Sequence, residues 1–338
     1  TTNTAPCEDG NPCTLADGCA LGVCKAGKAK NCDDSNGCTV DACDPKTGDC
    51  LHQNADGGSC DDGDACTADD RCAAGKCIPS GKADLSQQIG TGKAGYVDGD
   101  AKVAMFNQPW GIGRGPGNTV MVADLGSHTV RQISPDGSVK TYAGTGKPGW
   151  QDGPALKASF WSPSGLDRDA EGNIYVADLH NHRVRKISVG GTVSTFAGEG
   201  TSGWKDGFKS TARFDLPVGI AVDAAGVYVS ELSNHTIRLV TWDGMVVTVG
   251  GQPGKKGLVD GNSSVSRFDS PYGLAIGPGG GLYIADSGNH RIRFLTAANV
   301  VLTAAGSSKG FVDGPIQIAK FDSPIDVALL PSGNLLVA

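Results

Sequence analysis

Apolar and polar residues alternate in short runs along most of the chain from residue 85 onward, and turn residues separate these runs. In residues 163–207 the β-rich runs are GLDR, NIYVA, RVRKI and VSTFA, and the turns between them contain EGN, LHN and GG. Short alternating runs bounded by Gly and Asn predict antiparallel strands joined by tight turns. We therefore expect an all-β domain assembled from four-stranded units.

The unit recurs at a fixed interval. An Asp-Gly pair returns every 53 or 54 residues, a Phe follows it eight residues later, and a Pro comes three residues after the Phe. The Asp-Gly pairs begin at Asp98, Asp152, Asp206, Asp260 and Asp313. A four-stranded unit cannot bury both faces of its sheet alone, and radial stacking solves this, so the period predicts a β-propeller. Four units are complete and a fifth begins at Pro324, which we interpret as truncation of a larger ring.

The complete units share one sequence pattern. They are PWGIGRGPGNTVMVADLGSHTVRQI, PSGLDRDAEGNIYVADLHNHRVRKI, PVGIAVDAAGVYVSELSNHTIRLV and PYGLAIGPGGGLYIADSGNHRIRFL. These units resemble NHL repeats, and the resemblance covers nearly all of residues 85–338. It implies a propeller, commonly of six blades, used mostly to bind protein or RNA and in a few members for lyase chemistry. The chain departs from the pattern at Ser127 (for Asn), at Ser230-Glu231 (for Ala-Asp) and at Asp326 (for Gly).

The cysteines define a separate region, residues 1–84. They form three groups of four, spaced C-x5-C-x5-C-x4-C in the first and third groups and C-x5-C-x4-C-x6-C in the middle one. Modules of roughly 25 residues with few aliphatic side chains need covalent staples. We expect two disulfides within each group, no free thiol, and therefore a secreted or cell-surface protein. The spacing lacks the C-x2-C pairs that a zinc module needs. The cysteines are Cys7, Cys13, Cys19, Cys24, Cys32, Cys38, Cys43, Cys50, Cys60, Cys66, Cys72 and Cys77.

The middle group, CDDSNGCTVDACDPKTGDCLHQN, resembles the short cysteine-rich repeat of slime-mould extracellular-matrix proteins. The flanking groups keep only the CEDGNPCT and CDDGDACT halves of that pattern. The resemblance implies an extracellular spacer or matrix module. Asp61, Asp62 and Asp64 crowd together and could hold calcium, but Asx-turns explain them as well, and no full calcium-loop pattern is present. We favour the turns, and expect no cofactor other than, at most, calcium.

Charge divides at the same boundary. Residues 1–84 carry 15 acidic and 7 basic residues, and the rest of the chain carries 21 and 22, which together account for the net charge of −7. Neither region offers a basic patch for a phosphate backbone, so a nucleic-acid partner is not expected. No apolar run approaches the roughly 20 residues of a membrane span, so no transmembrane segment is expected.

Several motifs suggest enzyme chemistry but recur in every unit. Segments 90–95, 144–149 and 198–203 match G-x-G-x-x-G, but a turn follows each one instead of the helix that a dinucleotide site needs. Each complete unit also contains an acid, a His four residues later and an Arg three residues beyond it. An active site is needed once, so we interpret this set as structural. His180 and His182 form a His-x-His pair, an incomplete zinc site that keeps a metal-dependent lyase or lactonase as the alternative function.

The positions that break the repeat are the candidate binding residues. Trp110 and Tyr272 follow the Pro of their units, and Trp161 replaces an Asn or Asp. For Trp110 and Tyr272, a role in stapling neighbouring blades fits as well as a role in binding. Trp150 and Trp204 belong to loops that should lie on the same face, although a role in stapling neighbouring blades fits these loop residues better. Exposed aromatics around a concavity are typical of binding sites. We therefore predict a non-enzymatic binding or scaffold protein that holds a protein or glycan ligand on the loop-rich face of the propeller.

Overall fold

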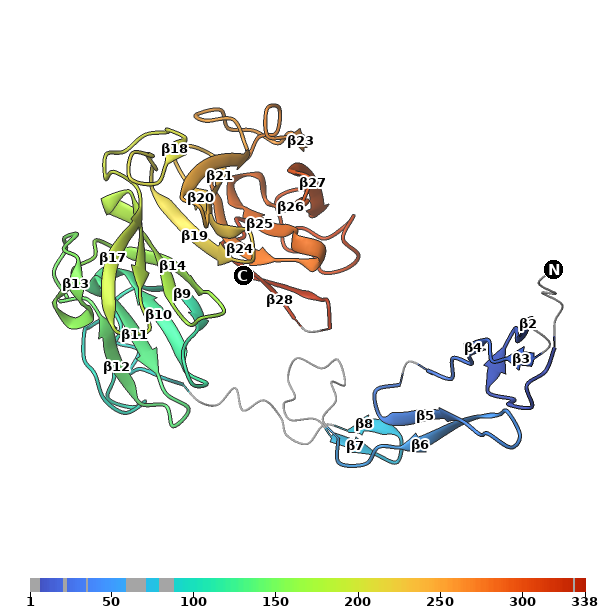
Figure 1. Cartoon of the computed structure of the whole chain (residues 1–338). Coiled ribbons are helices and arrows are strands. Elements are labelled where there is room, and N and C mark those ends of the chain that lie inside the picture. The colour runs from blue at the N-terminus through green and yellow to red at the C-terminus, as the bar shows by residue number, and fades with distance from the viewer. Residues whose placement is uncertain (1–6, 21–22, 35, 59–70, 79–87, 331) are drawn as a thin grey trace. The chain divides into compact units, whose positions relative to one another are not determined.

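The computed structural model divides into two compact units, Thr1–Ser86 and Gln87–Ala338, both built from strands (Figure 1). It describes residues 7–20, 23–34, 36–58, 71–78, 88–330 and 332–338. Among these residues, no helix has the length and apolar character needed to cross a membrane. The all-β prediction is confirmed.

The second unit is a propeller of four blades, each an antiparallel sheet (Figure 1). Four strands of each blade follow chain order from the innermost outward, and in blades two to four a short strand that precedes them in the chain forms the outer edge. Blade one contains β9 (Pro109–Arg114), β10 (Val120–Asp124), β11 (Thr129–Ile133) and β12 (Val139–Ala143). Blade two contains β14 (Pro163–Arg168), β15 (Ile174–Asp178), β16 (Arg183–Ile187), β17 (Thr192–Ala197) and the short outer β13 (Gly153–Pro154). The four predicted runs of this unit are therefore confirmed as strands.

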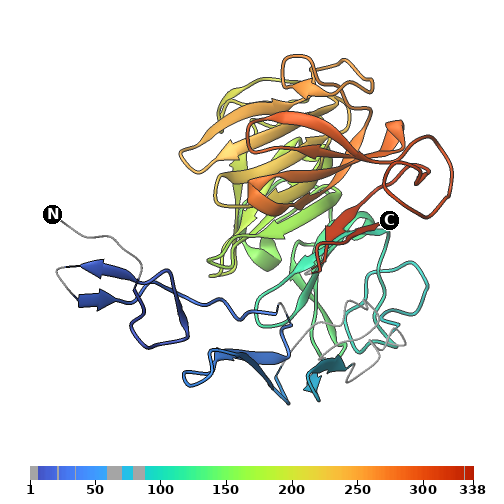
Figure 2. The same cartoon turned by 90° about the vertical axis from the view of Figure 1, so that its right-hand side faces the viewer.

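The later blades repeat this plan (Figure 2). Blade three contains β19 (Pro217–Val222), β20 (Gly226–Glu231), β21 (Thr236–Thr241), β22 (Met245–Gly250) and the outer β18 (Gly207–Phe208). Blade four contains β24 (Pro271–Ile276), β25 (Leu282–Asp286), β26 (Arg291–Leu295), β27 (Val300–Ala305) and the outer β23 (Gly261–Asn262). A hairpin of β28 (Val327–Leu329) and β29 (Leu335–Val337) follows and packs on β24.

Each pair of neighbouring blades shares one hydrophobic core. Between blades one and two, Met121 and Val130 pack against Phe160, Ile174 and Val176, and all five are almost completely buried. Equivalent clusters lie between blades two and three, between blades three and four, and between blade four and the hairpin. A sheet that cannot bury both faces alone thus buries each against a neighbour, which is the physical basis of the repeat.

The repeated Asp-Gly, Phe, acid and Arg markers meet in one network per blade. In blade two the fully buried Arg185 donates to the Asp178 carboxylate at 2.8 Å and to Asp152 at 2.5 Å, and it lies 5.2 Å from the centroid of the Phe160 ring. Asp152 in turn accepts hydrogen bonds from the N–H and hydroxyl of Thr195 on β17. The same network recurs around Arg131, Arg238 and Arg293. The acid and the Arg of the set thus make equivalent contacts in all four blades, as the structural interpretation predicts, which stays a prediction until it is tested.

The repeated histidines join one blade to the next. His182 follows the short 3-10 turn η3 (Leu179–Asn181) with a left-handed backbone, φ 53°, and its Nδ1 accepts the N–H of Leu216 from blade three at 3.3 Å. Nδ1 of each of the other three repeated histidines also accepts a backbone N–H. The pairs are His128 with Ser162, His235 with Ser270 and His290 with Ser323. Nδ1 of each His is therefore occupied as an acceptor.

The cysteine-rich unit is a series of short antiparallel pairs. The longest pair is β5 (Thr39–Cys43) with β6 (Cys50–Asn54), and a shorter one is β7 (Arg71–Ala73) with β8 (Lys76–Ile78). The first group contributes β2 (Gly18–Ala20) with β3 (Val23–Lys25), and β1 (Thr14–Leu15) with β4 (Lys28–Ala29). Few apolar side chains are buried here, and the buried ones include Cys32, Cys38 and Cys72.

The disulfides do not all close within their groups. Cys7–Cys24 and Cys32–Cys50 do so, but Cys13–Cys43 and Cys38–Cys72 join neighbouring groups. Cys19 is free and Cys77 is disulfide-bonded, whereas Cys60 and Cys66 lie outside the described residues. The predictions of pairing within groups and of no free thiol are therefore wrong.

The reason lies in the hairpins. The third and fourth cysteines of a group face each other across a hairpin, as Cys43 and Cys50 do. The fourth cysteine turns back to the first of its own group, and the third is reached by the second cysteine of the preceding group. Modules too small to bury a core are thus tied to each other as well as to themselves.

Candidate functional site

The innermost strands of the propeller line a central cavity of about 650 Å3. Its walls come from β9, β14, β19 and β24 and from residues 325–329, so every blade contributes to it. Each innermost strand begins at a repeated Pro, so the residues after this Pro mark one end of the cavity, its entrance. Trp110, Val218 and Tyr272 line the cavity there, whereas Ser164 is buried. We refer to this entrance as the channel mouth, defined by Trp110, Tyr272, Ile325 and Asp326.

Trp110 and Tyr272 meet at the channel mouth. Their ring centroids lie 5.9 Å apart with 35° between the planes, although they belong to blades one and four. Trp110 is 45% exposed and Tyr272 is half-buried, so neither ring is enclosed between blades. The equivalent Ser164 is fully buried and its hydroxyl donates to the carbonyl of Val218 at 3.0 Å. A small side chain at this position is thus sufficient for the packing of the blade. The large rings of Trp110 and Tyr272 are not required for that packing.

Trp161 lies at the junction of blades one and two. In the later junctions an Asp occupies this position and faces the repeated His, as Asp215 faces His182 with 3.6 Å between Oδ1 and Nδ1. Trp161 instead packs on the ring of His180 at 5.5 Å between centroids and remains 46% exposed. His180 and His182 are therefore engaged separately, and within the described part of the chain no third ligand gathers around them.

Trp150 and Trp204, the loop aromatics, are exposed but each is held by its own blade. Arg183 of β16 lies 4.5 Å from the Trp150 ring centroid, and the indole N–H of Trp204 donates to Thr248 of β22 at 2.9 Å. Both contacts stay within one blade, but Trp204 also lines a small pocket with Gln252 and Lys255 of the loop that leads into blade four. A role of these residues in stapling neighbouring blades therefore stays a prediction.

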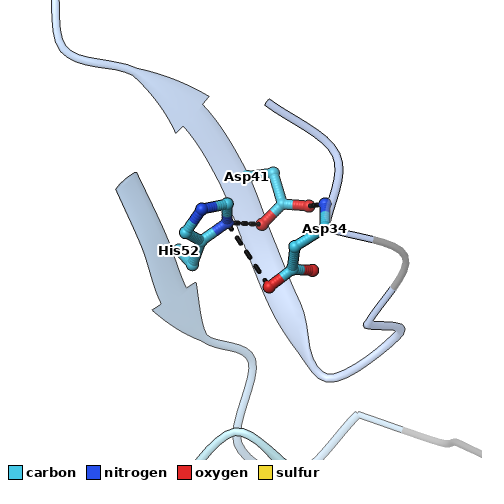
Figure 3. Close-up of side chains that lie close together, drawn as sticks. All are labelled: Asp34, Asp41 and His52. Carbon is cyan, nitrogen blue, oxygen red and sulfur yellow. Dashed lines mark hydrogen bonds and ion pairs between the residues drawn. The ribbon is translucent and has the colours of Figure 1, made fainter. Parts of the chain in front are cut away.

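A second cluster, which the sequence reasoning missed, lies in the cysteine-rich unit (Figure 3). His52 Nδ1 is 2.8 Å from a carboxylate oxygen of Asp41 and 3.4 Å from one of Asp34. The hydrogen bond from His52 lowers the pKa of Asp41, and the bond to Asp41 raises the pKa of His52. One ligand atom from each residue lies within 4.8 Å of the others, so this set could hold a divalent cation. The sequence could have pointed to this cluster, because the segment that resembles the slime-mould repeat contains all three residues.

The first cysteine group contains an equivalent carboxylate, Asp17, whose hydrogen bonds can be compared with those of Asp41. There the Asp17 carboxylate accepts the N–H of Asp9 at 3.1 Å, as Asp41 accepts that of Asp34 at 3.0 Å. The second oxygen of Asp17 accepts the N–H of Gly27 at 2.8 Å, the place that His52 takes on Asp41. The cluster is therefore first a hydrogen-bonded frame. The calcium candidates Asp61, Asp62 and Asp64 lie outside the described residues.

Family models match both units. The model of the NHL repeat matches residues 160–187 and 268–293, and that of the Dictyostelium (slime mold) repeat matches residues 31–53. The blades are NHL repeats. Both resemblances inferred from the sequence are thereby confirmed, since the matched ranges cover the second of the four quoted units, most of the last one and nearly all of the middle cysteine group.

Several known proteins are similar to this chain. "Protein SUPPRESSOR OF QUENCHING 1, chloroplastic" of Arabidopsis thaliana is 30% identical over 74% of this chain and 26% of its own length. "NHL repeat-containing protein 2" of Bos taurus is 29% identical over 68% of this chain and 37% of its own length. The chain thus spans between a quarter and two fifths of these relatives. A solved virginiamycin B lyase from Staphylococcus aureus is 15% identical, with a TM-score of 0.44 over 68% of this chain and 62% of that one.

Proposed function

We propose that this protein is a non-enzymatic binding or scaffold protein, secreted or displayed at the cell surface, which holds a protein partner at the channel mouth of its NHL propeller. One observation carries the proposal: Trp110 and Tyr272 stack on each other in the open cavity, where the fold requires neither ring. Large exposed aromatics at the centre of a concavity are the residue type and location of binding hot spots.

The acids and histidines of the repeat, which are the residue types that catalysis would use, form hydrogen bonds and ion pairs within the fold. The acids of the repeat, such as Asp178, are buried against arginines, and the histidines accept backbone N–H groups of the next blade. Burial raises the pKa of Asp178, and the positive charge of Arg185 opposes that rise. These partners are the same in all four blades, so the set serves the fold rather than a single reaction.

The proposed location rests on the cysteine-rich unit. Four disulfides are formed among the described residues, and such bonds persist in oxidising compartments. The propeller type does not decide the compartment, since one relative is chloroplastic by name. The Dictyostelium-type repeat adds the expectation of a matrix or spacer segment.

Selection of peptides from a random library on the purified protein tests the proposal without a known partner. We expect the enriched peptides to bind the wild type and to lose about 30-fold in affinity with Trp110→Ala, which is roughly 2 kcal/mol for a hot-spot residue. Trp242→Ala is the matched control, because Trp242 is equally exposed but does not line the cavity. Peptides that bind Trp110→Ala as tightly as the wild type, or binding to glycans alone, would contradict the proposal.

A further inference from the structure

The channel mouth contains one charged residue in a ring of glycines. Gly111, Gly165, Gly219 and Gly273 occupy the second position after the Pro in the four complete units. A Cβ at Gly165 would lie 2.4 Å from the carbonyl oxygen of Val218, so the close approach of neighbouring inner strands requires glycine there. The fifth unit has Asp326 at this position.

The carboxylate of Asp326 lies against the backbone of Gly273, next to Tyr272. One oxygen is 2.0 Å from the point where a Gly273 Cβ would stand, and the residue lines the same cavity as Trp110 and Tyr272. Within the part of the chain that the structure describes, the carboxylate accepts one hydrogen bond, from the N–H of Val327 at 2.9 Å, and pairs with no cation. Burial raises the pKa of Asp326, as expected for a carboxylate partly removed from water without a counter-charge.

The other charged groups of the cavity lie toward its opposite end. Arg114 is four residues beyond Trp110 along β9, or about 13 Å at the rise of a strand. Arg168 donates to the carbonyl of Gly115 at 3.1 Å, and Asp167 and Asp169 line the same end. Positive and negative side chains are matched there, which leaves the charge of Asp326 uncompensated at the mouth.

We propose that the partner inserts a positively charged side chain, lysine or arginine, into the channel mouth, where it pairs with Asp326 and lies against the rings of Trp110 and Tyr272. This inference rests on the proposed function and specifies the chemistry of the partner. The faces of Trp and Tyr rings attract cations within about 6 Å of the centroid. A half-buried carboxylate without a counter-ion is costly, and an incoming cation offsets that cost.

The test uses Nα-acetyl-argininamide as the probe and its citrulline analogue as the neutral control of nearly the same shape. The chain has five tryptophans, so its indole N–H signals can be followed by NMR, with Trp110 assigned through Trp110→Phe. We expect the arginine amide to shift the Trp110 signal in a saturable manner and the citrulline amide to leave it in place. Equal shifts with both amides, or no shift with either, would overturn the inference.

Asp326→Asn preserves the shape of the side chain. It should lower the affinity for the arginine amide at least tenfold and leave the melting curve unchanged. Asp322→Asn is the matched control, since Asp322 is an exposed carboxylate four residues earlier that lies 3.4 Å from Lys309. The affinity of the Asp322→Asn variant for the arginine amide should stay within twofold of the wild-type value. An unaltered affinity of the Asp326→Asn variant would refute the role of Asp326.

The library-selected peptides separate this inference from the proposed function. Peptides that need Trp110 but contain no essential basic residue and ignore Asp326→Asn would remove the cation inference and leave the proposed function standing. Peptides that ignore Trp110→Ala would remove the proposed function itself.

Discussion

At the scale of single residues, one buried arginine per blade connects parts of the chain that are far apart in sequence. Arg185 binds Asp178 from β15, Asp152 from the loop before the outermost strand, and the backbone carbonyls of Ser159 and Gln151. A fully buried guanidinium is tolerated only because nearly all its donors are satisfied. The arginine therefore fixes the entry loop of each blade relative to its middle strands.

Removing one partner of this network should be expensive. Asp178→Ala leaves the Arg185 charge buried without its closest fully buried counter-ion, so we expect the free energy of unfolding to fall by about 3–5 kcal/mol. The sequence alone suggested roughly 1 kcal/mol, the value for the loss of a turn acceptor. Chemical denaturation measures the difference. Asp313→Ala, at an exposed Asp-Gly without such an arginine, should change stability by less than about 0.5 kcal/mol. A loss near 1 kcal/mol for Asp178→Ala would show that the network contributes little.

The pair of His52 and Asp41 should give the cysteine-rich unit a pH dependence. The pKa of His52 is raised above 6.5, so its contribution is complete below 6.5 and disappears as the pH rises through the folded pKa. The pKa of Asp41 is lowered below 3.8, so its contribution is complete above 3.8 and disappears as the pH falls through the folded pKa. The pair, with Asp34 as the neighbouring charge, therefore stabilises the hairpin most between these two values.

NMR titration of the His52 ring measures the pKa of this side chain directly. We expect an apparent pKa above 6.5 in the wild type and a shift back toward 6.5 in Asp41→Asn, with Asp49→Asn as the exposed control. A wild-type value at or below 6.5 would mean that the hydrogen bond is not formed in solution.

At the scale of elements, the hairpins of the cysteine-rich unit are linked like a chain. Each of β5–β6 and β7–β8 is attached to the preceding group by a bridge from that group's second cysteine, with Cα–Cα distances of 5.7 and 5.2 Å. These distances are ordinary for disulfides. Because the bridges cross between groups, no group of four is a self-contained module, and the unit should respond to reduction as one body.

Peptide mapping without reduction should find Cys13 joined to Cys43 and Cys38 joined to Cys72. Alkylation of the native protein should label Cys19, because its thiol is half-buried and unpaired. A digest in which Cys13 is joined to Cys24, or in which Cys19 resists alkylation after denaturation without reduction, would contradict this connectivity.

At the scale of the whole propeller, symmetry explains the fold and its violations locate the site. The phenylalanines, the arginines and the Asp-Gly pairs recur because every blade must solve the same packing problem against its neighbour. Trp110, Tyr272, Trp161 and Asp326 depart from that solution, and three of them line the cavity that all blades share. We therefore expect partner recognition by this protein to depend on the few positions where the repeat is broken.

The sequence by itself determined the strands, the blades and the positions of the aromatic candidates. Alternation and a 54-residue period are local signals, and each unit has a single way to bury its sheet against the next. Trp110 and Tyr272 could be singled out because the repeat supplied its own comparison at every equivalent position.

Only the tertiary structure decided which of these residues touch. Four cysteines allow three pairings within a group, and bridges between groups add more, so spacing could not single out Cys13–Cys43. The cluster of Asp34, Asp41 and His52 and the stacking of Trp110 on Tyr272 depend likewise on how hairpins and blades meet in space. A repeat specifies what each unit looks like, whereas contacts between units arise from packing geometry that no single unit encodes.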